Sequence, residues 1–185
     1  MTAWHIRMAV RALRSGGVIA YPTEGVYGLG CDPMNADAVY RILAMKQRKV
    51  DKGLIMVAAN IEQVLPYIQP LSDEQLATLQ QTWPGPTTWI IPARAEVPVW
   101  IRGKHSGLAI RVSSHPVIQA LCTEFDGPII STSANSSGRP PARSALQVRQ
   151  ALSILPDVIL SAELGGKGSA TEIRDLSSGA IVRAG

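Results

Sequence analysis

Two short polar segments carry the side chains best suited to chemistry. Lys46 and Arg48 stand at the end of a segment with helical periodicity, and residues 131–135 (Ser-Thr-Ser-Ala-Asn) follow a short apolar run. A guanidinium binds phosphate or carboxylate oxygens with two parallel hydrogen bonds, and an ammonium acts as a point charge. Together with the hydroxyls, these residue types predict a site for an anionic ligand.

The cations of the first segment also have simpler interpretations. Basic residues are common at helix C-termini because they complement the helix dipole, so Lys46, Arg48, Lys49 and Lys52 could form a solvated helix end. The same charges could bind an RNA backbone. A phosphate clamp is favoured by the planar fork of Arg48 close to two lysines. The residues alone leave all three interpretations open.

The second segment and a strand-like segment at 108–112 add further polar groups. Residues 131–137 include four serines, a threonine and an asparagine, which is more than a polar turn requires. Arg111 lies among apolar residues, and a strand cation must either point to solvent or meet a buried anion. A carboxylate ligand would satisfy it. Arg183 is interpreted more simply as a charge on an edge strand.

The elements that must position these residues alternate between helix and strand. Ser72 and Gln75 form a capping box at one helix start. Helices are predicted up to Gly16, over 36–46, after Asn60, from Ser72 to 83, from Ser114 to 125 and over 145–152, and strands over 18–21, 54–57, 87–91, 108–112, 129–130 and around Val158 and Ile181. This alternation predicts a single α/β domain.

Glycines mark two further segments. Gly25, Gly28 and Gly30 miss the spacing of the dinucleotide fingerprint, and they predict a loop whose backbone could approach a ligand closely. A glycine-rich turn with a buried Tyr27 is the alternative. Residues 165–169 are the loosest stretch of the chain and lack the first glycine of a P-loop. A nucleotide would therefore need a non-standard cradle.

Composition bounds the class of protein. The chain has 185 residues, of which 46% are hydrophobic, enough for one substantial core. Eighteen basic and 14 acidic residues leave a net charge of +4, which fits an acidic substrate or a nucleic acid without deciding between them. No serine sits in a GxSxG elbow, so direct transfer between bound substrates suits the residues better than nucleophilic hydrolysis.

Cysteine, histidine and apolar patterns bear on metal sites and location. Cys31 and Cys122 form no CxxC pair and the three histidines form no HExxH motif, so neither a disulfide framework nor a zinc site is predicted. The N-terminal segment lacks the apolar core of a signal peptide. The longest apolar run, 54–59, is far shorter than the ~20 residues that span a bilayer. We expect a cytoplasmic protein without a membrane segment.

Six ordered motifs resemble the YrdC/Sua5 family in its short, TsaC-type form. They are residues 21–24 (Tyr-Pro-Thr-Glu), 27–30 (Tyr-Gly-Leu-Gly), 46–48 (Lys-Gln-Arg), 83–87 (Trp-Pro-Gly-Pro-Thr), 108–112 (Leu-Ala-Ile-Arg-Val) and 131–135. The resemblance implies one YrdC-like domain over 1–185, without the C-terminal Sua5 extension. It also implies a twisted mixed sheet flanked by helices, with a large basic concave cavity.

The resemblance further implies a reaction. The family condenses L-threonine, bicarbonate or CO2 and ATP to threonylcarbamoyl-AMP, releasing pyrophosphate, and the product serves the threonylcarbamoyladenosine modification of tRNA. Mg²⁺ would accompany ATP without a metal site on the protein. The implied partners are the downstream tRNA threonylcarbamoyl transferase proteins, and direct binding of tRNA is a further possibility.

Family positions carried onto this chain assign two groups of site residues. The resemblance implies a catalytic, nucleotide-binding tetrad of Lys46, Arg48, Ser133 and Asn135, with Lys52 and Arg183 as further ATP contacts. It implies a threonine site formed by Thr23, Arg111, Ser131 and Thr171, in which Arg111 holds the carboxylate.

Two other classes of function remain open from the sequence. The basic cavity could serve a noncatalytic RNA-binding or ribosome-maturation factor, which would show steep salt dependence and no threonine-dependent ATP consumption. An amino-acid hydrolase or carbamoyl transferase using the same pocket would turn over without ATP.

Overall fold

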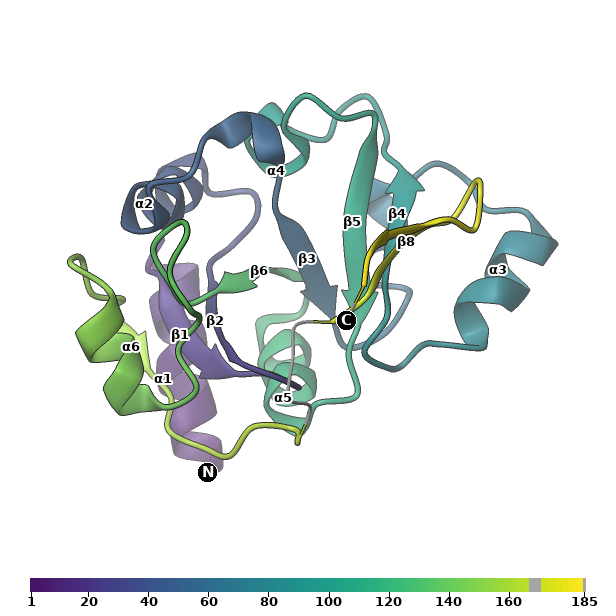
Figure 1. Cartoon of the computed structure of the whole chain (residues 1–185). Helices are drawn as coiled ribbons and strands as arrows, with labels where there is room; N and C mark the ends of the chain where they lie inside the picture. The colour runs from purple at the N-terminus through teal and green to yellow at the C-terminus, as the bar shows by residue number, and fades with distance from the viewer. Residues whose placement is uncertain (167–170, 185) are drawn as a thin grey trace.

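A mixed β-sheet forms the centre of the protein (Figure 1). The computed structural model describes residues 1–166 and 171–184. The strands are β1 (Ile19–Pro22), β2 (Tyr27–Gly30), β3 (Ile55–Ala58), β4 (Thr88–Pro92), β5 (Gly107–Val112), β6 (Ile129–Ser133), β7 (Val158–Ile159), β8 (Ile173–Asp175) and β9 (Ile181–Arg183). Within the described residues they form one sheet in the order β7-β1-β2-β6-β3-β5-β4-β8-β9. Parallel and antiparallel pairs both occur, which confirms the predicted α/β class with a mixed sheet.

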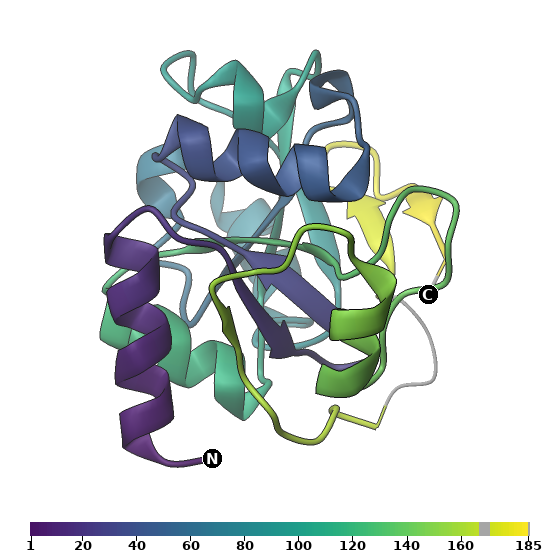
Figure 2. The same ribbon diagram turned by 90° about the vertical axis from the view of Figure 1, so that its left-hand side faces the viewer.

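Helices flank this sheet. They are α1 (Ala3–Arg14), α2 (Ala36–Lys46), α3 (Asp73–Gln80), α4 (Val99–Arg102), α5 (Pro116–Phe125) and α6 (Ala145–Ala151), with 3-10 turns at η1 (Val50–Lys52) and η2 (Leu65–Tyr67). Figure 1 shows α2 and α4 above the sheet and α1 and α5 below it. In Figure 2, α2 crosses the upper part of the molecule, and α1 stands to one side of it.

Several predicted boundaries are confirmed and others are wrong. The 36–46 helix and the Ser72–Gln75 capping box are present as predicted. Asn60 accepts a hydrogen bond from the Gln63 backbone in a turn and begins no α-helix. The cap of α5 is His115 instead of Ser114, because Pro116 occupies the first helical position.

Strand β8 was not predicted, and the predicted loose stretch lies only partly within the described residues. Residues 173–175 pair with β4, and β9 then pairs with β8 at the sheet edge. This places the predicted edge-strand residue Arg183 on the outermost strand. Of the stretch 165–169, residues 167–169 lie outside the described residues.

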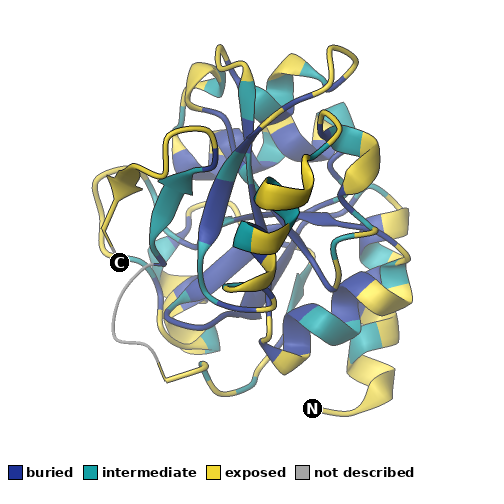
Figure 3. Ribbon diagram, turned by 90° about the vertical axis from the view of Figure 1, so that its right-hand side faces the viewer, coloured by how far each residue is buried: buried dark blue, intermediate teal, exposed yellow. Residues whose placement is uncertain are grey.

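The two faces of the sheet bury separate apolar clusters. Successive strand side chains point to opposite faces, so Ala20 and Met56 join one cluster while Tyr21 and Val57 join the other. The first cluster packs against α2, α3, α4 and α6, and the second against α1 and α5. Figure 3 shows buried residues along the inner strands and exposed residues on the outward sides of the helices.

The same alternation explains why a cation lies within an apolar strand. In β5, Leu108, Ile110 and Val112 point into the first cluster. Arg111 therefore points to the opposite face. That face is only partly covered by helices, since α1 and α5 lie towards β1 and away from β4.

Strand register shows how far the uncovered part of this face extends. Arg111 lies opposite Val57, a member of the second cluster, on the neighbouring strand β3. Two residues away on β3, Ile55 pairs with Ala109 on one side and with Ser131 on the other. These side chains share one face beyond the helices, so the sheet itself forms the floor of an open space.

The predicted glycine loop is wrong for residues 27–30, which form β2. A Cβ on Gly30 would lie 2.6 Å from the Ile130 carbonyl oxygen and 2.8 Å from Cε1 of Tyr21. The absence of a side chain thus lets the Tyr21 ring pack against the strand. Tyr27 is buried, as the alternative interpretation predicted.

We expect Gly30→Ala to destabilise the protein by about 1–3 kcal/mol, because the added methyl group would overpack this contact. Urea denaturation measures the change. Gly127→Ala is the matched control, since a Cβ there would approach nothing closer than 3.8 Å. Equal stability of both variants would contradict the packing role of Gly30.

Candidate active site

The uncovered face of the sheet forms a cavity of about 910 Å³. Its walls come from β2, β6, β3, β5, β4, β8 and β9, together with the segments around Gly53 and Ser106. Eight of the ten predicted site residues line it, namely Thr23, Arg48, Lys52, Arg111, Ser131, Ser133, Thr171 and Arg183. The cavity lies across the face of the sheet and not only at its strand ends.

Cations dominate the charged groups of the described lining. It includes six cationic side chains, Arg48, Lys52, Arg102, Lys104, Arg111 and Arg183, and one carboxylate, Asp175. A concave surface with one sign of charge concentrates its field on a ligand of opposite sign. Partial desolvation, followed by repulsion from Arg111 and Arg48, lowers the pKa of the Arg183 guanidinium. The positive charges of Arg111 and Arg48 therefore act on the Arg183 guanidinium.

Lys46 and Asn135 do not line the cavity but stand directly behind Ser133. The Lys46 ammonium donates to Asn135 Oδ1 and to the Asn135 carbonyl, each at 3.0 Å, to Ser133 Oγ at 3.4 Å, and to the Ser133 carbonyl. Ser133 Oγ in turn donates to Asn135 Oδ1 at 2.6 Å. The predicted tetrad residues Lys46, Ser133 and Asn135 thus form one hydrogen-bonded cluster.

The C-terminal end of α2 positions the ammonium group of Lys46. Gln47 has a left-handed conformation with φ of 51°, which terminates the helix and sends the chain towards Arg48. Lys46 is only 4% exposed, so the interpretation of a solvated helix end is wrong for it. Burial, followed by the nearby charge of Arg48, lowers the pKa of Lys46 to about 8.

Arg48 and Lys52 extend the cluster along the cavity wall. Arg48 Nη2 donates to the Gly53 carbonyl at 2.9 Å, which holds the guanidinium over the η1 turn. Its Nε is buried without a hydrogen-bond partner, and burial lowers the pKa of the group. Lys52 is exposed at the cavity rim. Arg48 therefore has donors available for an anion in the cavity.

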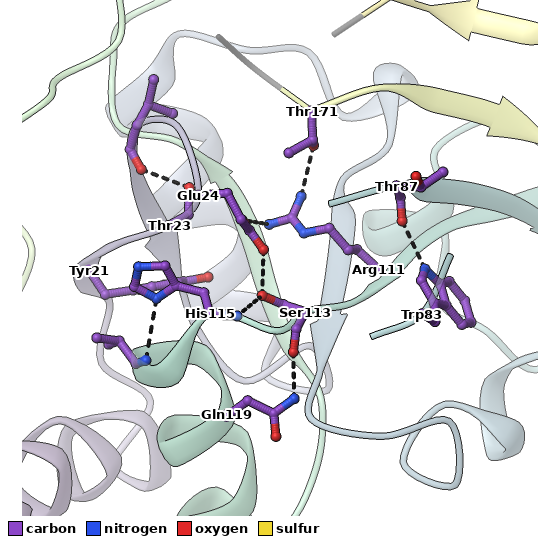
Figure 4. A network of polar contacts seen from close by, with 12 residues as sticks. Tyr21, Thr23, Glu24, Trp83, Thr87, Arg111, Ser113, His115, Gln119 and Thr171 are labelled. Atoms are coloured by element: carbon purple, nitrogen blue, oxygen red, sulfur yellow. Dashed lines mark hydrogen bonds and ion pairs between the residues drawn. The ribbon is translucent and has the colours of Figure 1, made fainter. Parts of the chain in front are cut away.

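Arg111 meets a buried anion of the protein itself. Its Nη2 lies 3.3 Å from Glu24 Oε2, and its Nη1 donates to Thr171 Oγ1 at 3.0 Å (Figure 4). Arg111 and Glu24 are 4% and 6% exposed. Of the two alternatives that the sequence allowed for this cation, solvent or a buried anion, the structure shows a buried anion, a carboxylate of the protein, and Arg111 also lines the cavity, where a ligand would bind.

A polar network behind Arg111 was missed from the sequence (Figure 4). Ser113 Oγ donates to Glu24 Oε1 at 2.5 Å and accepts from the His115 backbone N–H at 3.0 Å. His115 is buried, and desolvation lowers its pKa, so the imidazole is neutral at neutral pH. The sequence does contain a signal that could have identified Glu24 as a site residue. It lies in the Tyr-Pro-Thr-Glu motif, next to the predicted site residue Thr23.

A comparison with known protein families shows to which family the chain belongs. The profile of the Sua5/YciO/YrdC family, described as "Telomere recombination", matches residues 11–185. The chain belongs to this family. Its cavity and its buried Lys46 cluster are therefore features of a Sua5/YciO/YrdC domain.

Similar proteins of the Sua5/YciO/YrdC family cover the whole chain. A threonylcarbamoyl-AMP synthase from Pseudomonas aeruginosa is 50% identical over 183 residues, covering 99% of this chain and 98% of that protein. The crystal structure of P. abyssi Sua5 complexed with L-threonine is 31% identical with a TM-score of 0.91, covering 99% of this chain and 54% of the larger Sua5 chain. E. coli YciO is 27% identical with a TM-score of 0.87, covering 100% of this chain and 90% of YciO.

Helices able to cross a bilayer are absent from the described part of the chain, because none of them combines the necessary length with sufficient apolar content.

Proposed function

We propose that this protein is a threonylcarbamoyl-AMP synthase, which condenses L-threonine, bicarbonate or CO2 and ATP and releases pyrophosphate. The observation that carries the proposal is that one cavity joins two kinds of site. One wall has the cation and hydroxyl cluster around Ser133, and another has the Arg111–Thr171 pair. Curated relatives with that name match almost the full chain at about 50% identity.

The nucleotide is proposed to bind at the Lys46 cluster. Arg48 and Lys52 would contact the phosphates, Ser133 and Asn135 would hold the Lys46 ammonium at the adjacent wall, and Arg183 would approach from β9. Charged donors fixed before the ligand arrives stabilise developing phosphate charge without reorganisation during the reaction. The bond from Arg48 to Gly53 supports this view, because it fixes the guanidinium in place.

The amino acid is proposed to bind at the Arg111 end of the cavity. The Arg111 guanidinium would hold the threonine carboxylate through donors that Glu24 and Thr171 leave available. Thr23 and Ser131 line the same region and offer hydroxyl groups for the remaining polar atoms. The threonine nitrogen would then lie between Glu24 and the nucleotide, as an ammonium until it loses a proton for the reaction.

The proposed chemistry needs no protein nucleophile. The threonine ammonium first loses a proton, and the free amine then attacks CO2 with release of a second proton, or bicarbonate with loss of water, forming a carbon–nitrogen bond and a carbamate. A carbamate oxygen then attacks the α-phosphorus of ATP in line, while the bond to the β-phosphate oxygen breaks and pyrophosphate leaves. Holding the reactants in contact supplies much of the acceleration.

Mg²⁺ is proposed to enter as part of the ATP substrate. When bound to the phosphates, it neutralises their charge during phosphoryl transfer. This ion prefers oxygen ligands and keeps several waters, so it needs few protein carboxylates. The described lining includes oxygen ligands for such an ion, among them the Asp175 carboxylate and the hydroxyls of 131–133.

The product, a mixed anhydride, is proposed to pass to the proteins that transfer the threonylcarbamoyl group to tRNA. We also propose the cytoplasm as the compartment, because ATP and tRNA meet there. Direct contact with tRNA remains part of this proposal, with Arg102 and Lys104 at the cavity as the cations available to its backbone.

Pyrophosphate release tests the function. It should be measured with ATP and bicarbonate while L-threonine is added, omitted or replaced by serine, and we expect release to require threonine. Release that ignores threonine, or amino-acid turnover without ATP, would overturn the proposal. A noncatalytic RNA-binding factor would instead bind RNA with steep salt dependence and release no pyrophosphate.

ATP binding is expected to weaken as the pH rises above about 8, where Lys46 loses its proton in the free protein. A neutral amine no longer attracts phosphate, so KM for ATP should rise by up to about tenfold per pH unit. Lys46→Arg should remove this dependence, because a guanidinium keeps its charge. A flat profile for the natural protein would contradict the role of Lys46.

The same pKa shift predicts how stability changes with pH. The folded protein binds the Lys46 proton more weakly than the unfolded chain, whose pKa is the ordinary 10.5. Stability of the free protein should therefore rise between about pH 8 and pH 10.5, since the unfolded state binds more protons there.

A further inference from the structure

We propose that Glu24 is a positioning residue for Arg111, and that the Glu24–Arg111 pair makes this end of the cavity selective for a zwitterionic amino acid over a simple carboxylate. The inference rests on the function proposed above and deepens it. It adds a selectivity device beneath the threonine site.

The first step is how firmly Arg111 is held. Glu24 Oε2 lies 3.3 Å from Arg111 Nη2, and Thr171 accepts from Nη1 on the other side at 3.0 Å. The two partners fix the plane of the guanidinium (Figure 4). A planar fork binds a carboxylate with two hydrogen bonds only if its orientation is correct.

The second step is how firmly Glu24 is held. The Ser113 hydroxyl accepts from the His115 backbone N–H, which leaves its own proton for Glu24 Oε1 at 2.5 Å. Ser113 is fully buried, and its backbone N–H donates to the Ala58 carbonyl at 3.1 Å. The carboxylate is thus anchored where β3 and β5 end, so it cannot follow Arg111 freely.

The third step is the charge balance of the site. Arg48, Lys52 and Arg183 line the cavity and form no ion pair with any described residue, whereas Arg111 is paired with Glu24. The pair has no net charge, so phosphate groups should prefer the other cations. A zwitterion also has no net charge, and it therefore fits the neutral pair better than a free anion does.

The fourth step is the pair of buried atoms that lack a hydrogen-bond partner. Among the described residues, Arg111 Nε and Glu24 Oε2 are both of this kind, although Glu24 Oε2 keeps its ion pair with Arg111 Nη2 at 3.3 Å. A buried donor or acceptor that makes no hydrogen bond is unfavourable. An α-amino acid offers a carboxylate to the donor and an ammonium to the electrostatic field of the acceptor, whereas a simple carboxylate offers only the first.

The test compares Glu24→Gln with the natural protein. KM for L-threonine should rise between about tenfold and 100-fold, because Arg111 loses its fixed orientation. KM for ATP should stay within about twofold. The probe for selectivity is 3-hydroxybutyrate, which resembles threonine without its amine, used as a competitive inhibitor. Its inhibition constant should change by a smaller factor than the threonine KM, because 3-hydroxybutyrate has no ammonium that Glu24 could attract, so the preference for the zwitterion shrinks.

Two further variants keep the test decisive. Glu172→Gln is the matched control, since it removes the carboxylate that pairs with Arg174 at 2.5 Å outside the cavity lining, and its threonine KM should not change. Ser113→Ala keeps both charges but frees Glu24, so it should change the threonine KM in the same direction by a smaller factor. If Glu24→Gln does not fold, Ser113→Ala decides the question by the same measurements.

The outcomes separate this inference from the proposed function. Absence of threonine-dependent pyrophosphate release from the natural protein would overturn the function and this inference with it. Normal release from the natural protein, with an unchanged threonine KM and unchanged discrimination against 3-hydroxybutyrate in the variants, would overturn this inference alone. Direct titration of L-threonine by calorimetry should give the same ranking of the variants.

Discussion

Replacing Arg48 by alanine should reduce threonine-dependent pyrophosphate release by about 100-fold or more, because removing one preorganised donor to a developing charge typically has that effect. The guanidinium is half-buried at the cavity, beside the Lys46 cluster and over the η1 turn. It is the arginine fork of the proposed phosphate site, and no neighbouring side chain reproduces its bidentate geometry.

The fold should survive this change. Arg48→Ala loses two hydrogen bonds, to the Gly53 carbonyl at 2.9 Å and to the Lys52 carbonyl at 3.4 Å, and a typical hydrogen bond is worth about 0.5–1.5 kcal/mol. Steady-state release of pyrophosphate and thermal unfolding measure the two effects separately. Lys49→Ala is the matched control, since Lys49 is exposed and does not line the cavity. Activity close to that of the natural protein in Arg48→Ala would contradict the assignment.

Arg111→Met should lower the free energy of unfolding by about 3–5 kcal/mol, because it leaves the Glu24 carboxylate buried without its cation. It should also abolish saturation by L-threonine within accessible concentrations, because methionine cannot bind a carboxylate. Urea denaturation and the dependence of pyrophosphate release on threonine measure these changes.

A second substitution separates the two roles of Arg111. In the double variant Arg111→Met with Glu24→Gln, the buried charge is removed, so part of the lost stability should return. Binding of threonine should not return, because the donor of the carboxylate site is still missing. Recovery of threonine-dependent activity in the double variant would show that Arg111 acts only as a structural partner of Glu24.

Local patterns in the sequence were sufficient for most elements. The periodicity of 36–46 and the cap at Ser72 depend on residues within one or two turns, so α2 and the start of α3 were predictable. The errors lie where a distant residue decides. Residues 27–30 resemble a loop because they contain two glycines, yet they form a strand because they pair with β1 on one side and β6 on the other. Gly30 fits there because a Cβ would lie too close to the Ile130 carbonyl and the Tyr21 ring.

Part of the site could be predicted from the sequence for the same reason. Motifs identified the residue types at Lys46, Arg48, Ser133 and Asn135, and Arg111 was recognised as a cation that needed an anion. Which anion it meets was not visible. Glu24 is fixed by Ser113 across a separation of 89 residues, and no local pattern specifies that contact.

By itself, the sequence determined most of the helices and strands, which side chains can do chemistry and which family the motifs resemble, because these features depend on neighbouring residues. Tertiary structure alone decided that Lys46 is buried against Ser133, 87 residues away, and that Glu24 shares the charge of Arg111. The physical reason is strand pairing. Placing β6 between β2 and β3 and covering one face of the sheet only partly brings the polar side chains of distant strands to one open surface.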